Sequence, residues 1–287
     1  MSRSGFVQRR HADGSSKWMG EELGRAPRMN RQRKMASYVI ERGTVTIQEL
    51  VESFGVSQMT VHRYLAELER QGVVRRFRGG ASAQPSGVFE SNVLYRKSSM
   101  QNEKAAIALR ARTFIEPGMS LLLDEGTTTL ALAGLLADIA PLTVITNYMA
   151  IMRVVSEMSD IRLISLGGEY LKSHDSYVGV QCIENARGLR PDLAILSTSA
   201  IGQGAAFHQE QEIVLVKRAM MDSASRRMLL VDHSKLASVA LHRFASLSEF
   251  DLVITDDGAS TEQIEDLVSH SVAFELAPMH AEATSNK

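Results

Sequence analysis

The sequence predicts a two-domain α/β protein, with a small N-terminal winged helix-turn-helix followed by a larger domain built on a mainly parallel sheet. Three observations support this prediction. The chain has 287 residues, which is long for one small domain. Its charge is divided, because residues 1–84 hold 15 Lys and Arg against 8 Asp and Glu, whereas residues 85–287 hold 17 against 25. Apolar segments of strand length alternate with helical segments only in the second part.

Composition places the expected domain boundaries. Residues 1–28 are rich in Ser, Gly and Arg and show no helical or strand period, so we expect a disordered extension. The helix-turn-helix domain is expected over residues 29–84. A Pro- and Gly-containing segment then predicts a linker over 85–92. The α/β domain is expected over 93–275, with a C-terminal tail over 276–287.

Cysteine usage and hydropathy exclude several classes of protein. The single Cys182 excludes an internal disulfide and a Cys-based zinc cluster, and it agrees with a reducing compartment. No apolar run approaches the ~18 residues that span a bilayer, and the N-terminal residues lack the apolar segment of a signal peptide. We therefore expect a cytoplasmic protein that carries no cofactor and no metal ion.

Two short helices are predicted about three residues apart in the N-terminal domain. In the segment TIQELVESF, Thr46 can cap a helix with Glu49 as its capping-box partner. Gly55 permits a tight turn, and Ser57 can cap the second helix. The apolar residues recur at helical spacing and form the expected inner faces, which are Ile47, Leu50, Val51 and Phe54 in the first helix and Val61, Leu65 and Leu68 in the second. This pair of helices predicts a helix-turn-helix.

The start and the outer face of the second helix are expected to read DNA. Arg63 lies opposite the buried stripe, where its guanidinium can fork onto a guanine, although a solvated surface position explains both Arg63 and His62 as well. The predicted reading residues are Ser57, Gln58, Met59, Thr60, His62 and Arg63.

A small β-wing is predicted after the second helix. The segment VVRRFRGGA alternates apolar and basic residues and ends in two glycines. Arg75, Arg76 and Arg78 then face the phosphate backbone and clamp the duplex. The alternative is that the three arginines serve only solubility.

The C-terminal domain is predicted from six apolar segments separated by helical stretches. Near-continuous apolar strands of this kind indicate a parallel sheet covered on both faces. The segments are SLLLD (120–124), LTVITN (142–147), IRLISL (161–166), LAILST (193–198), MLLVD (228–232) and DLVIT (251–255).

Polar residues and glycines follow several of these strands, at the edge where ligands of parallel sheets bind. Asp124, Gly126, Thr127 and Thr128 lie where a strand meets a helix, which favours an anion, although a helix cap without a ligand has the same appearance. The other candidates are Asn147, Gly167, Gly168, Asp232, His233, Ser234, Lys235, Lys217 and Arg218. For Lys235 a structural salt bridge is the alternative, and for Lys217 a solvated position.

The motifs resemble the DeoR/GlpR family of transcriptional repressors along most of the chain. The N-terminal match is FGVSQMTVHRYLAELERQGVVRRFRGGA, and the C-terminal matches are GMSLLLDEGTTTLALAGLLA, TVITN, LISLGGE, VKRAMM and LLVDHSK. The resemblance implies a repressor of carbohydrate genes whose second domain is similar to ribose-5-phosphate isomerase and senses a phosphorylated sugar. The effector residues it implies are Asp124, Gly126, Thr127, Thr128, Asn147, Gly167, Gly168, Lys217 and Lys235.

Two stretches depart from the family pattern. The family usually has two arginines and an aspartate where this chain has His62, Arg63 and Tyr64, so we expect a different operator sequence. The stretch GAAFHQEQ offers fewer glycines and polar contacts than the family does, which leaves Gly202, Glu210 and Glu212 in doubt as effector contacts.

The expected partners are double-stranded operator DNA, a small phosphorylated metabolite and further copies of the chain, as a dimer or a tetramer. The principal alternative is a sugar-phosphate isomerase fused to a DNA-binding domain. Such an enzyme needs a general base, for which Asp124, Glu125 and Asp232 are candidates, but none has a paired acid at a telling spacing. A further alternative is a repressor whose pocket is now only structural.

Overall fold

The computed structural model describes residues 31–32, 34–36, 38–39, 42–70, 73–82, 96–97 and 99–279. The chain divides into two compact units between Gln84 and Pro85, and each unit is described by itself. The expected extension over 1–28 and the expected linker over 85–92 lie outside the described residues, as do residues 280–287 of the expected tail.

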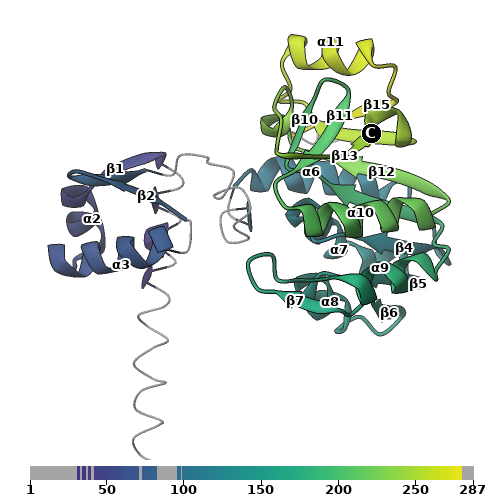
Figure 1. Ribbon diagram of the computed structural model, residues 1–287, viewed down its shortest axis with the longest axis horizontal. Helices are drawn as coiled ribbons and strands as arrows, with labels where there is room; N and C mark the ends of the chain where they lie inside the picture. Colours follow the sequence, from purple (N-terminus) through teal and green to yellow (C-terminus); the bar gives the residue numbers. More distant parts are fainter. Residues whose placement is uncertain are drawn as a thin grey trace, which may run out of the picture. The chain divides into compact units, whose positions relative to one another are not determined.

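The first unit has the helix-turn-helix that the sequence predicts, together with a small antiparallel sheet whose strand β1 precedes the two helices and whose strands β2 and β3 follow them (Figure 1). The sheet has the strand order β1-β3-β2. The bounds are β1 Thr44–Thr46, α2 Ile47–Phe54, α3 Gln58–Arg70, β2 Arg75–Phe77 and β3 Gly80–Ser82.

Local capping forms the two helices as predicted. Thr46 Oγ1 accepts a hydrogen bond from the Glu49 amide at 3.2 Å, and Glu49 Oε2 accepts one from the Thr46 amide at 2.6 Å. Gly55 takes the left-handed conformation at φ +59°, which turns the chain between the helices. Ser57 Oγ then accepts a hydrogen bond from the Thr60 amide at 3.3 Å. The predicted inner residues Val61, Leu65 and Leu68 are buried.

The second unit is organised around a seven-stranded parallel sheet with the order β15-β14-β12-β9-β4-β5-β6. Six of these strands confirm the six predicted segments. The prediction missed β15, a four-residue strand that ends at Ala277, two residues beyond the expected end of the domain. The bounds are β4 Ser120–Leu123, β5 Leu142–Thr146, β6 Ile161–Ser165, β9 Leu193–Ser197, β12 Arg226–Leu230, β14 Leu252–Asp256 and β15 Phe274–Ala277.

Helices cover both faces of this sheet, and successive strand residues point to opposite faces. Leu121 and Leu123 pack with α6, α7 and α8, whereas Leu122 packs with α9, α10 and α11. The bounds are α6 Gln101–Arg112, α7 Thr127–Ala133, α8 Met149–Val155, α9 Val180–Arg187, α10 Gln211–Ser223 and α11 Thr261–Ser269. None of the helices in the described ranges is long and apolar enough to cross a membrane.

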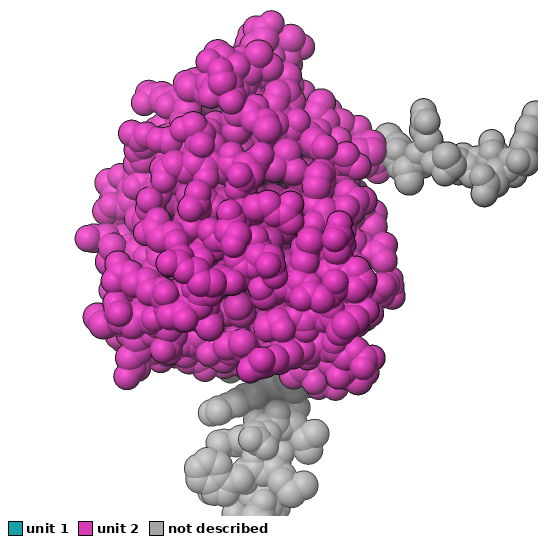
Figure 2. Space-filling model, turned by 90° about the vertical axis from the view of Figure 1, so that its right-hand side faces the viewer, with its two compact units in different colours: residues 1–84 teal, residues 85–287 magenta. Residues whose placement is uncertain are grey.

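Short strands that the sequence did not predict form two further small sheets. A hairpin of β7 and β8 follows β6, and β10 and β11 follow β9 and form a second sheet with β13. Figure 2 shows one face of the resulting unit, whose described residues form a continuous body. The bounds are β7 Glu169–Leu171, β8 Ser176–Val178, β10 Ala200–Gly202, β11 Ala205–His208 and β13 His242–Ser246, with 3₁₀ turns η1 Leu136–Ile139, η2 His233–Lys235 and η3 Leu247–Glu249.

Gly168 is the glycine on which the packing of the β7–β8 hairpin depends. Its φ is +115°, and a Cβ there would lie 2.5 Å from the carbonyl oxygen of Val178. We predict that Gly168→Ala lowers the free energy of unfolding of the second unit by about 1–3 kcal/mol or more, because the added methyl group meets rigid backbone. Urea unfolding of the full chain, followed by circular dichroism, measures this change.

Gly134→Ala is the matched control. Gly134 is at the end of α7 with φ −64°, and an added Cβ would lie 3.5 Å from the Ala131 carbonyl oxygen, an ordinary contact distance. This substitution should leave stability unchanged or raise it slightly. Equal effects of the two substitutions would contradict the assignment for Gly168.

Candidate functional site

The start of α3 presents an exposed polar surface in the first unit. Ser57, Gln58, His62 and Arg63 are exposed, Thr60 is half-buried, and Met59 is 82% exposed. Tyr64 differs from this group because its side chain is 5% exposed and lies in the core. The expectation that Tyr64 alters the reading face is therefore wrong, and of the two departures from the family pattern only His62 lies on that face.

The three wing arginines do not share one environment. Arg76 Nε lies 2.6 Å from Glu69 Oε2 in α3, and the Arg76 amide donates to Glu69 Oε1 at 2.9 Å. These hydrogen bonds hold the pKa of Glu69 below its usual range. Arg75 and Arg78 are exposed. Arg76 thus ties the wing to α3, and the phosphate contacts of the three arginines stay a prediction.

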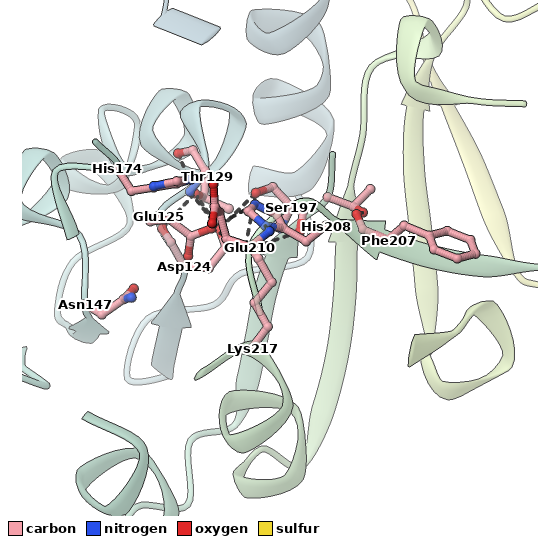
Figure 3. Close-up of polar contacts among 12 residues, drawn as sticks. Asp124, Glu125, Thr129, Asn147, His174, Ser197, Phe207, His208, Glu210 and Lys217 are labelled. Atoms are coloured by element: carbon pink, nitrogen blue, oxygen red, sulfur yellow. Dashed lines mark hydrogen bonds and ion pairs between the residues drawn. The ribbon is translucent and has the colours of Figure 1, made fainter. Parts of the chain in front are cut away.

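A polar cluster lies at the carboxyl ends of β4, β5 and β9 in the second unit (Figure 3). Asp124 and Glu125 follow β4, Asn147 follows β5, and Ser197 ends β9. The side chain of Lys217 reaches the two carboxylates from α10. All five residues are buried, and four of them are fully inaccessible to solvent. We call these five residues the strand-end cluster.

Asp124 is fully engaged within the protein. Its Oδ1 accepts hydrogen bonds from the Gly126 amide and the Thr129 hydroxyl, both at 3.0 Å. Its Oδ2 accepts from the Ser197 amide at 2.6 Å and from Lys217 Nζ. Asp124 therefore shapes the turn into α7, and its role as an effector contact stays a prediction.

Lys217 carries its charge inside the protein. Its Nζ lies 3.0 Å from Glu125 Oε1 and donates to the Ser197 carbonyl oxygen at 3.1 Å. Burial opposes the charge, but Asp124 and Glu125 outweigh it and raise the pKa of Lys217. Burial also opposes the charge on Glu125, and Lys217 and Arg96 together lower the pKa of that carboxyl. The Glu125 carboxylate and the Lys217 ammonium therefore stay ionised together.

Two buried histidines border the strand-end cluster, and the sequence analysis missed both. His174 lies between β7 and β8 and His208 ends β11, with ring centroids 5.8 Å apart. His208 Nε2 lies 3.9 Å from Glu125 Oε1, and His208 Nδ1 accepts a hydrogen bond from the Glu210 amide at 3.1 Å. Burial and then positive charge lower both pKa values, that of His174 to about 4, so both rings are neutral near pH 7.

Several buried polar atoms around the cluster have no aligned hydrogen-bond partner among the described residues. Buried polar groups in native proteins are nearly always paired, so such a set indicates a place for a polar ligand or water. Glu125 is included because its contact with Lys217 is an ion pair without hydrogen-bond alignment. The atoms are Glu125 Oε1 and Oε2, Asn147 Oδ1, Tyr148 Oη, His174 Nε2, Ser176 Oγ, and Arg96 Nε and Nη2.

The predicted residues that follow β4 and β6 are in two places. Gly126 caps α7 beside Asp124, and a Cβ there would lie 2.2 Å from Ser197 Oγ. Thr127 is half-buried and Thr128 is buried in the first turn of α7. Gly167 and Gly168 follow β6, where Gly168 makes close backbone contact with β8, so these two glycines shape the hairpin that carries His174.

Lys235 lies in η2, which follows β12. It is half-buried beside Asp232, and its charge and that of Asp232 both reach Lys104 of α6. Asp232 Oδ1 accepts a hydrogen bond from the Ser234 hydroxyl. Burial lowers the pKa of Lys104 to about 8. The remaining strand-end candidate, His233, pairs with Asp256 at 2.6 Å.

The stretch GAAFHQEQ borders the strand-end cluster through His208. The residues left in doubt as effector contacts were Gly202, Glu210 and Glu212. Gly202 packs in β10, where a Cβ would lie 2.6 Å from the Ser238 carbonyl oxygen, and Glu212 is exposed on α10. Arg218 pairs with Glu249 at 2.7 Å. No group of His, Cys, Asp and Glu within the described ranges can hold a metal ion.

Comparison with known proteins matches both parts of the chain to family models. Residues 31–86 match the DeoR-like helix-turn-helix domain, and residues 99–257 match the DeoR C terminal sensor domain. The glycerol-3-phosphate regulon repressor of Escherichia coli (strain K12) is 33% identical over 83% of this chain and 94% of its own length. The uncharacterized HTH-type transcriptional regulator YgbI of the same organism is 33% identical over 87% of this chain and 98% of its own length.

Among solved structures, a D-ribose-5-phosphate isomerase in complex with phospho-erythronic acid aligns with 48% of this chain and 53% of its own. The TM-score is 0.34 and the sequence identity 18%.

The ion cluster generates a prediction about stability and pH. Lys217→Met leaves Asp124 and Glu125 buried without their ammonium partner, so we expect the free energy of unfolding near pH 7 to fall by about 3–5 kcal/mol. In the variant the folded-state pKa of Glu125 rises above its unfolded value, so stability increases as the pH falls from 7 towards 5. The wild-type carboxyl has a lowered pKa and gives no such gain in this range.

Urea unfolding at pH 7 and pH 5 tests this account. The double variant Lys217→Met with Glu125→Gln is the control, because it removes the carboxylate that titrates and should weaken the pH dependence. If Lys217→Met is as stable as the wild type at both pH values, the buried ion cluster is not essential to this edge of the sheet.

Proposed function

This chain belongs to the DeoR family of transcriptional regulators, and from that membership we propose that it represses genes of carbohydrate metabolism and responds to a phosphorylated sugar or a related metabolite. The observation that carries this proposal is the set of buried, unpartnered polar atoms beside the strand-end cluster, which lies within the sensor domain. We propose that the metabolite binds there.

The first unit supports the DNA-binding half of the proposal. Arg63 is exposed in the first half of α3, where recognition helices contact base edges, and its guanidinium stands 5.5 Å from the centre of the Tyr64 ring. A buried aromatic ring beneath the guanidinium limits the positions that the side chain adopts. Arg75 and Arg78 of the wing supply charges for phosphates.

The polar atoms of the second unit suit a hydroxylated anion. Glu125 and Asn147 present oxygens that accept hydrogen bonds from hydroxyl groups. The turn from Gly126 to Thr128 adds hydroxyls and the first amides of α7. A sugar phosphate carries hydroxyl groups and an anionic phosphate group. The similar repressor is named for glycerol-3-phosphate, which is a small hydroxylated anion.

The isomerase alternative finds no support in the candidate bases. Asp124 accepts hydrogen bonds on both oxygens, and Lys217 holds the pKa of Glu125 below its usual range, which makes that carboxylate a weak base. Asp232 is buried and accepts a hydrogen bond from Ser234. A general base needs a free oxygen directed at the substrate. The unpartnered atoms also argue against a purely structural pocket.

We further propose that the protein acts in the cytoplasm as a homodimer or homotetramer. A regulator must reach the chromosome, and two helix-turn-helix units related by a two-fold axis match palindromic half-sites.

A ligand screen tests the sensing half. Phosphorylated sugars and glycerol 3-phosphate are added to the full chain, each beside its unphosphorylated counterpart as a control. At about 100 times its dissociation constant, a true effector stabilises the folded state by about 2.7 kcal/mol and raises the unfolding midpoint. The same compound should change the affinity for DNA. If no phosphorylated compound shifts the midpoint more than its counterpart, sensing of this class of metabolite is refuted.

Substitution of Arg63 tests the DNA-binding half. A DNA fragment that the wild type selects from a random pool serves as the operator, and a scrambled fragment measures non-specific binding. Arg63→Ala should reduce the ratio of the two affinities by about 10- to 100-fold, because a bidentate base contact is worth about 1–3 kcal/mol. Fluorescence anisotropy at fixed salt concentration measures the ratio.

Arg70→Ala is the control for this test. Arg70 ends α3 and pairs with Glu67 of the same helix. Its loss should leave the ratio of affinities unchanged. If Arg63→Ala keeps the wild-type ratio of specific to non-specific affinity, Arg63 does not contact base edges.

A further inference from the structure

A charged side chain from outside the strand ends acts electrostatically on the residues of the candidate pocket. Arg96 precedes α6 and is half-buried, yet its Nε and Nη2 are inaccessible to solvent and have no hydrogen-bond partner among the described residues. A guanidinium keeps its charge at any pH at which the protein folds. Leaving two of its nitrogens dry and unpaired costs free energy that a ligand can recover.

The backbone around Arg96 is fixed to the sensor domain. Lys104 of α6 is buried, and its Nζ donates hydrogen bonds to the carbonyl oxygens of Arg96 and Ser99. Lys97 Nζ lies 5.7 Å from the centre of the Tyr148 ring and 3.9 Å from Asp175 Oδ2. Tyr148 follows Asn147 at the end of β5, so this segment lies against the edge of the sheet that carries the strand-end cluster.

The charge of Arg96 acts on the pocket residues. Burial raises the pKa of Glu125, and the charge of Arg96 acts with the larger effect of Lys217 to lower it. For His174 and His208 burial is the largest cause of the lowered pKa, and Arg96 adds to it, in His208 after Lys217. These three groups come from β4, from the β7–β8 turn and from β11. Arg96 is therefore within electrostatic reach of several walls of the pocket.

The guanidinium of Arg96 offsets the negative charge that the other pocket residues present to an anion. In their ionised forms Asp124, Glu125 and Lys217 sum to one negative charge, and the ammonium is already held by both carboxylates. The two pocket histidines are neutral near pH 7. Without Arg96 an incoming phosphate meets a net negative surface, and with Arg96 the cluster is neutral and has directed N–H donors.

We propose that Arg96 is an anion-binding residue of the sensor pocket, and that its guanidinium pairs with the phosphate group of the effector. This inference rests on the proposed function and deepens it, because it assigns the phosphate contact to a residue outside the strand ends. Only residues 85–95 separate Arg96 from the N-terminal unit.

The test uses inorganic phosphate and the full chain. The thermal unfolding midpoint is measured against phosphate concentration, with chloride keeping the ionic strength constant, for the wild type, Arg96→Met, Arg96→Gln and Arg96→Lys. We expect phosphate to stabilise the wild type, the two uncharged variants to need at least about tenfold more phosphate for the same shift, and Arg96→Lys to keep most of the response.

Arg187→Met is the matched control, since Arg187 is an exposed arginine of α9 that pairs with Glu184 of its own helix. It should respond as the wild type does. The measured quantity is the phosphate-dependent shift of the unfolding midpoint rather than the midpoint itself, so a general loss of stability does not change the result. Arg96→Gln replaces Arg96→Met if the latter does not fold.

Two results would overturn the inference. One is an equal phosphate response in the wild type and the uncharged variants, and the other is a wild type that phosphate stabilises no more than chloride does. Failure of the proposed function is a separate result, in which the wild type neither binds DNA selectively nor changes its DNA affinity with any phosphorylated sugar. A variant without Arg96 that still releases DNA at the wild-type sugar phosphate concentration refutes only the role of Arg96.

Discussion

The burial of one charged lysine shapes the functional half of the molecule. Lys217 is inaccessible to solvent, and an ammonium in such a place requires countercharges and hydrogen-bond acceptors. Asp124, Glu125 and the Ser197 carbonyl oxygen provide them, and together they join α10 to the ends of β4 and β9. Asp124 in turn fixes the first turn of α7 through Gly126 and Thr129. A single ion cluster thus positions a helix, two strand ends and the loop between β4 and α7.

The cluster also decides which groups remain for a ligand. Lys217 and Asp124 pair with each other. These two predicted effector residues therefore have little hydrogen-bonding capacity left for a ligand. The capacity lies around them, in Glu125, Asn147 and His174. In the proposed pocket, a ligand binds these groups without reorganising the charged core, which lowers the cost of binding.

Much of the fold was predictable from local pattern, and part of the site was not. Thr46, Glu49 and Ser57 predict the two helices, because capping involves residues only three or four positions apart. The apolar segments predict the buried strands because they are long enough to indicate burial. Strand β15 and the hairpins have three or four residues each and carry no usable period. His174 and His208 lie on those short elements, and Arg96, the proposed phosphate contact, precedes α6 and follows none of the predicted strands. Tyr64 lies three residues after Val61, so the helical period itself predicts its burial, and only the comparison with the family pattern placed it on the reading face.

The central claim is that one pocket in the sensor domain and one DNA-reading surface are coupled. Allosteric coupling is reciprocal, so a metabolite that changes DNA affinity by some factor must have its own affinity changed by DNA by the same factor. The direct measurement is the dissociation constant of the stabilising sugar phosphate for the full chain, by isothermal titration, without and with saturating selected DNA. The account predicts equal factors in the two directions, each about 5- to 150-fold. Identical affinities with and without DNA would contradict it.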